Sequence, residues 1–68
     1  MYNNSISARL ITKTMAAEYV GVGTIKFTEL VDCGVMPKPV QLSERKIMWD
    51  KQDLDIAIEN LKKKSESN

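Results

Sequence analysis

The sequence predicts a single, mainly α-helical domain that carries one small β-hairpin. Two short segments have the apolar spacing of amphipathic helices, and each is followed by a glycine, Gly21 or Gly34. Pro37 and Pro39 then exclude a helix and precede two runs suited to β-strands, after which a longer amphipathic segment closes the chain. A chain of 68 residues has room for one such domain with a small hydrophobic core.

The first helix is expected over about Lys13–Val20. The hydroxyl group of Thr12 can cap its N-terminus, and Gly21 can end it in the left-handed conformation. The inward side of this helix is expected to carry Met15, Ala16, Tyr19 and Val20.

The second helix is expected over about residues 24–33, with Gly23 or Thr24 as its cap. Its inward side follows the i, i+3, i+4 rule and carries Phe27, Leu30 and Val31. The turn between the two helices spans only residues 21–23, which is typical of a helix–turn–helix.

The hairpin is expected to pair residues 40–42 with residues 46–49 across a tip made by Ser43, Glu44 and Arg45. Asp50 can cap a last helix that frays at Lys62 and carries an apolar stripe of Leu54, Ala57, Ile58 and Leu61. The order of these elements predicts a winged helix–turn–helix: two short helices, a β-hairpin wing and a C-terminal helix. We expect a flexible N-terminus over residues 1–8, the folded domain over residues 9–61 and a flexible basic tail over residues 62–68.

The aromatic side chains are expected to build the core. Tyr19, Phe27 and Trp49 all fall on sides of their elements that should face inward. Cys33 is expected to be a small buried or half-buried residue without a redox task.

Composition excludes several kinds of chemistry. The chain has no histidine and one cysteine, so a zinc site, a disulfide within the chain and a nucleophile activated by histidine are not expected. The glycines stand singly, which excludes a phosphate-binding P-loop. We therefore expect no catalytic residue, no cofactor and no metal site. Four acidic residues in the last helix are expected to be solvated charges: Asp50, Asp53, Asp55 and Glu59.

The sequence also carries no signal for a membrane or for export. No apolar run approaches the roughly 20 residues of a membrane helix. The first residues lack the basic and apolar regions of a signal peptide. We expect a cytoplasmic protein without a membrane partner.

Several stretches resemble a family of DNA-binding proteins. Residues 10–12, 16–18 and 21–22 resemble the opening of excisionase-like and MerR-like helix–turn–helix domains. Residues 36–40, followed in order by Leu42, Arg45, Trp49 and Asp53-Leu54, are more similar to AlpA-like phage and prophage transcriptional regulators. The resemblance covers about residues 9–61. It implies a winged helix–turn–helix that binds double-stranded DNA and regulates transcription.

The candidate contacts with DNA lie on the second helix and on the hairpin. Such a helix reads bases in the major groove, and phosphate contacts set its position. Ile25 either touches a thymine methyl group or packs locally against the turn or the hairpin, and both interpretations stay open. Arg45 and Lys46 are candidates for phosphate or minor-groove contact, although a polar hairpin tip is about as common. The candidate DNA-binding residues are Thr24, Ile25, Lys26, Thr28, Lys38, Arg45 and Lys46.

The charge of the chain keeps two other functions open. The formal net charge is +1, and residues 1–61 carry seven basic against eight acidic residues, a net charge of −1. DNA-binding domains usually carry a positive excess, so we expect weak, salt-sensitive binding that is useful through a homodimer or side-by-side assembly on DNA. One alternative is an excisionase-type architectural factor that acts with an integrase. Another is a protein-interaction module that has lost DNA binding, which Glu29 and exposed Ile25, Ile56 or Met36 would favour.

Overall fold

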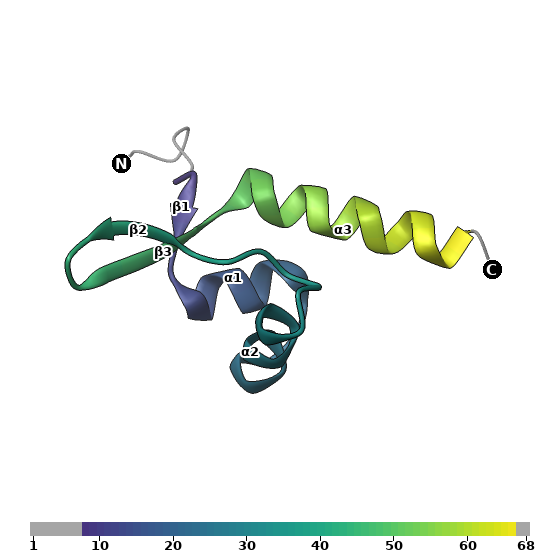
Figure 1. Cartoon of the computed structure of the whole chain (residues 1–68), viewed down its shortest axis with the longest axis horizontal. Coiled ribbons are helices and arrows are strands. Elements are labelled where there is room, and N and C mark those ends of the chain that lie inside the picture. Colours follow the sequence, from purple (N-terminus) through teal and green to yellow (C-terminus); the bar gives the residue numbers. More distant parts are fainter. Residues whose placement is uncertain (1–7, 67–68) are drawn as a thin grey trace, which may run out of the picture.

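The computed structural model describes residues 8–66, which form three helices and a three-stranded antiparallel sheet (Figure 1). The three expected helices and the hairpin are confirmed. The expectations for residues 1–7 and 67–68 concern residues outside the described range. In chain order the elements are β1 (Leu10–Ile11), α1 (Lys13–Val20), α2 (Thr24–Asp32), β2 (Val40–Ser43), β3 (Lys46–Asp50) and α3 (Lys51–Glu66).

The sheet has the strand order β1-β3-β2, so β3 lies in the centre. Its register with β2 pairs Val40 with Met48 and Gln41 with Ile47, and an irregularity follows between Gln41 and Ser43. β2 includes Ser43, which was expected in the tip, so only residues 44–45 make the turn. The strand β1 was not predicted. It pairs Ile11 with Trp49, and two residues are too few to show the alternation by which a strand is recognised.

Both short helices begin and end near the expected residues. The Thr12 hydroxyl accepts a hydrogen bond from the Met15 amide at 3.3 Å, and Gly21 ends α1 with φ of 99°. α2 starts after Gly23, whose lack of a side chain leaves this end without a side-chain cap. Beyond α2, the amides of Val35 and Met36 both donate to the Leu30 carbonyl, at 2.9 and 3.0 Å. These bonds turn the chain back toward the body of the domain.

The core lies where α1, α2, the start of α3 and the sheet meet. The rings of Phe27 and Trp49 pack edge to face, with centroids 5.3 Å apart. The Trp49 indole N–H also donates to the Pro37 carbonyl at 2.9 Å. The expected burial of Phe27 and Trp49 is confirmed, whereas Met36, which was expected to be exposed, is 2% exposed. The buried core residues are Ile11, Ala16, Ala17, Phe27, Met36, Trp49, Leu54 and Ala57.

Four other side chains are more exposed than expected. Met15 and Tyr19 are 49% and 46% exposed, because α1 packs through its small residues Ala16 and Ala17. The Tyr19 hydroxyl donates instead to a carboxylate oxygen of Asp55 at 2.7 Å. Cys33 is exposed as well, beyond the end of α2. Leu61 lies in the predicted stripe, but the core does not reach that far along α3.

The helix α3 and the hairpin project from the body in opposite directions (Figure 1). Only Leu54 and Ala57 of α3 are buried, and the helix continues to Glu66 instead of fraying at Lys62. The radius of gyration is 13.2 Å, against about 11 Å for a compact chain of this length. Within residues 8–66, no helix has the length and apolar character that crossing a membrane requires.

Candidate nucleic-acid interface

A shallow groove of about 190 Å³ lies between α2 and the segment that leads into the hairpin. Thr28 and Asp32 border it from α2, and Pro39 borders it from the opposite side. Lys13 enters from the first turn of α1, and Trp49 forms part of its wall. The packing of Trp49 on Phe27 holds this wall against α2. Residues from α1, α2, β3 and the segment before the hairpin therefore meet at one groove, whose polar side chains are Lys13, Thr28 and Asp32.

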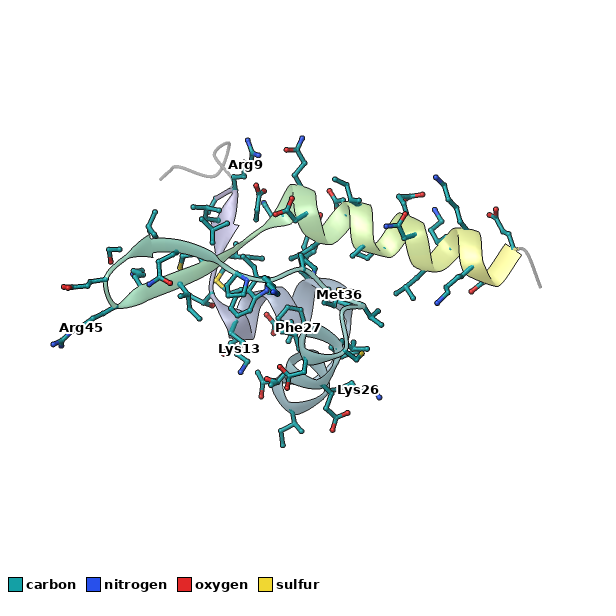
Figure 2. All side chains as sticks on the ribbon, viewed as in Figure 1. Arg9, Lys13, Lys26, Phe27, Met36 and Arg45 are labelled. Atoms are coloured by element: carbon teal, nitrogen blue, oxygen red, sulfur yellow. The ribbon has the colours of Figure 1, made fainter. Side chains whose placement is uncertain are left out.

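The groove and the hairpin carry the cations that have no acidic partner. Among the described residues, Lys13, Lys38, Arg45 and Lys46 make no ion pair within 4.0 Å. Figure 2 shows Arg45 at the outer end of the hairpin and Lys13 on the side of the molecule where α2 lies. An external anion can bind such cations without displacing an intramolecular carboxylate.

Arg9 and Lys26 form ion pairs within the chain. Arg9, which precedes β1, forms an ion pair with Asp50 at an N–O distance of 2.9 Å. On α2, the Lys26 ammonium group lies 3.6 Å from a carboxylate oxygen of Glu29, and both side chains are more than 60% exposed. Such an exposed pair is weak, so Lys26 can exchange its partner at little cost.

The candidate residues of α2 lie near its N-terminus. Ile25 is 79% exposed, which excludes one of its two open interpretations, local packing against the turn or the hairpin. The Thr28 hydroxyl donates to the Thr24 carbonyl at 3.0 Å, so its oxygen remains able to accept a hydrogen bond. Thr24 and Lys26 are exposed. In Figure 2 Lys26 lies far from Arg45, so the candidate residues of α2 and those of the hairpin tip form two separate groups.

The hairpin tip is braced from within. The Gln41 side-chain amide donates to the Ser43 carbonyl at 2.8 Å and to the Glu44 carbonyl at 3.4 Å. This bracing fixes the turn that carries Arg45 and Lys46. Glu44 also lies at the tip, and its carboxylate forms no ion pair among the described residues.

The junction between the hairpin and α3 is held by a small polar network. The Arg9 guanidinium donates to both carboxylate oxygens of Asp50, at 3.0 and 2.9 Å, and to the Gln52 side chain at 2.8 Å. The backbone N–H of Gln52 donates to a carboxylate oxygen of Asp50 at 2.9 Å, so Asp50 caps α3 as expected. The hydrogen bonds from Arg9 and then from the Gln52 amide hold the pKa of Asp50 below its usual value.

The acidic side chains of α3 lie away from the groove. Asp53 lies in the first turn of α3, and Asp55 accepts a hydrogen bond from Tyr19, which raises the pKa of that phenol. Glu59 is paired with Lys62 at 3.3 Å. Within residues 8–66, no group of three metal-ligating side chains is close enough to hold an ion.

Two charged residues of the groove, Lys13 and Asp32, were not among the candidates predicted from the sequence. Both are polar residues at helix ends, and no periodic pattern indicates which neighbouring element such a residue faces. A signal existed only for Lys13, since the first helix of a helix–turn–helix crosses the DNA backbone. No protein family, curated protein or solved structure matches the chain closely enough to indicate a relative.

Proposed function

We propose that the protein binds double-stranded DNA as a winged helix–turn–helix and regulates transcription. In this proposal α1 and α2 are the helix–turn–helix, and the β2–β3 hairpin is the wing. α2 enters the major groove with its N-terminal residues toward the bases, and the wing contacts the backbone. The protein would then act in the cytoplasm, with DNA as its partner.

The observation that carries the proposal is the position of the unpaired cations. Lys13 lies at the groove beside α2, and Arg45 and Lys46 lie at the turn and start of β3. Lys38 precedes β2. Phosphate neutralisation by such cations supplies most of the sequence-independent affinity of DNA-binding proteins. α3 is neutral, with four lysines against four acids, so the net charge of +1 comes from six basic and five acidic residues in the rest of the chain.

The candidate residues on α2 have the chemistry for sequence recognition. Ile25 projects a hydrophobic side chain that suits a thymine methyl group. Lys26 can leave Glu29 for a guanine or a phosphate, and the Thr28 oxygen can accept from a base amine. Thr24 lies at the N-terminus of α2, where backbone amides favour a phosphate.

The proposal is tested by fluorescence anisotropy with a labelled duplex from the operon of the protein. Four phosphate contacts give a slope of about −3.6 in a plot of log K against log salt concentration. Replacing Arg45 and Lys46 together by alanine should reduce this slope to about −1.8. The matched control replaces Lys62 and Lys63 by alanine, because it removes the same charge from α3.

The two double variants separate specific placement of charge from charge itself. The proposal requires that the hairpin variant loses affinity and slope while the α3 variant keeps most of both. Equal effects would mean that only net charge matters and would contradict a docked wing. A folded wild-type protein that binds no duplex at low salt would refute DNA binding altogether.

A further inference from the structure

We propose that α3 is also a self-association surface, on which a second copy of the chain packs its own α3 in the antiparallel direction. The inference does not depend on DNA binding. It rests on an unfilled channel beside α3, on hydrophobic side chains exposed along it, and on the order of charges in the helix.

The channel runs between α3 and the segment that follows α2. Two adjoining hollows of about 250 and 390 Å³ share Gly34, Val35, Ala57 and Asn60, so they form one continuous depression. Its helix side is lined by Asp53, Ile56, Ala57, Asn60, Leu61 and Lys64. Spacings of three and four residues place these side chains on one face of α3.

This face carries hydrophobic surface that the domain itself does not cover. Ile56 is 57% exposed and Leu61 is 39% exposed. Ile56 borders the first hollow of the channel and Leu61 borders the second. A helix of 16 residues is about 24 Å long, so its outer half offers a straight, accessible surface to another helix.

The charges along α3 indicate which partner fits. Three acids, Asp53, Asp55 and Glu59, are followed by three consecutive lysines, Lys62, Lys63 and Lys64, and the helix begins at Lys51 and ends at Glu66. Two parallel copies would bring like charges together, whereas two antiparallel copies bring the three acids of each helix against the three consecutive lysines of the other. The helix is therefore complementary to itself in reverse.

One antiparallel register satisfies the whole face at once. It places Asp53 opposite the partner's Lys64 and Ile56 opposite the partner's Leu61. A two-fold axis repeats each contact, so the dimer has two ion pairs and two hydrophobic pairs. One helix face buries less area than a stable dimer needs. We therefore expect a dissociation constant in the micromolar to millimolar range.

Sedimentation equilibrium of the full chain without DNA, at increasing protein concentration, measures this association. Ile56→Glu places a charge in the centre of the contact and should weaken association at least about tenfold. Leu42→Glu is the matched control, because Leu42 is 53% exposed but lies on the hairpin. A monomer at all concentrations up to about 1 mM, or a larger loss in the control, would overturn the proposal.

Charge reversal tests the register. Asp53→Lys and Lys64→Glu should each weaken self-association by about fivefold or more, and a mixture of the two variants should form a heterodimer in which both ion pairs are restored. No heterodimer from two helical variants would overturn the antiparallel register. Circular dichroism verifies that both variants are helical, since Asp53 lies in the first turn of α3. If Asp53→Lys lowers the helix content, Lys64→Glu alone decides, and unchanged association then refutes the contact.

Discussion

Replacing Trp49 by phenylalanine tests how the hairpin is attached to the helices. The indole of Trp49 is 3% exposed, packs edge to face on Phe27 and donates a hydrogen bond to the Pro37 carbonyl. Phenylalanine retains an aromatic ring next to Phe27, but it loses the hydrogen bond and leaves a cavity. The substitution therefore weakens a side chain that joins β3, α2 and the segment before the hairpin.

The magnitude follows from these contacts. A hydrogen bond of this kind contributes about 1 kcal/mol to the free energy of unfolding. The missing ring volume of about 40 Å³ costs about 1 kcal/mol more as a cavity, and an imperfect ring contact adds up to about 1 kcal/mol. The total of about 2–3 kcal/mol is large beside the roughly 3–10 kcal/mol expected for a domain of this length. The midpoint of thermal unfolding should fall by about 8–24 °C.

The assay is urea unfolding followed by far-UV circular dichroism, because the variant lacks the only tryptophan of the chain. Leu42→Ala serves as a control on the exposed part of the hairpin and should change the free energy of unfolding by less than about 0.5 kcal/mol. A loss below about 0.5 kcal/mol for Trp49→Phe would refute the assigned role of the indole.

Three further predictions concern charge and backbone. Asp32→Asn removes an acid from the groove and should raise DNA affinity about two- to fivefold at 0.1 M salt, whereas Glu66→Gln on α3 should not, which anisotropy titrations check. Arg9 lowers the pKa of Asp50 in the folded state. The ionised carboxylate therefore stabilises the fold fully at pH values above about 3.9, its pKa in the unfolded chain. This stabilisation is lost as the pH falls through the lower pKa of the folded state. The free energy of unfolding in urea should thus fall more steeply below pH 4 in the wild type than in Asp50→Asn, and parallel pH profiles would contradict this. Gly21→Ala should cost about 1–2 kcal/mol of stability in thermal unfolding, because φ is 99° although no heavy atom lies within 4 Å of the added Cβ.

The elements that follow from local chemistry were predictable from the sequence. Thr12 caps α1 through its own hydroxyl group, and Gly21 ends it because glycine adopts a positive φ without strain. Pro37 and Pro39 exclude a helix wherever the rest of the chain lies. Asp50 caps α3 within two residues of itself. Each of these effects depends only on neighbours in the sequence.

The features that were predicted wrongly, or not predicted at all, depend on contacts between residues distant in the sequence. β1 exists because Ile11 pairs with Trp49, and the bond between Arg9 and Asp50 spans 41 positions. Met36 lies in a segment without periodicity, so no pattern shows that the chain turns back and buries it. The phase of α1, with only eight residues, was too ambiguous to prefer Ala17 over Tyr19 as a core residue.

The candidate interface likewise has one part that the sequence predicts and one part that depends on tertiary contacts. Residue type and order predict cations on the hairpin and polar residues at the start of α2. The groove itself needs the packing of Trp49 on Phe27, which brings Lys13 and Asp32 to one surface. Pairwise partners of charges, such as Glu29 for Lys26, likewise become visible only when side chains have positions.

β3 passes into α3 without a loop, since the strand ends at Asp50 and the helix begins at Lys51. The only backbone dihedrals at which the two elements can pivot are therefore those of the residues at this junction, and Arg9 clamps both Asp50 and Gln52 there. The angle between the hairpin and α3, which project in opposite directions (Figure 1), is therefore set at this junction, and the packing of Leu54 and Ala57 in the core holds the helix at that angle.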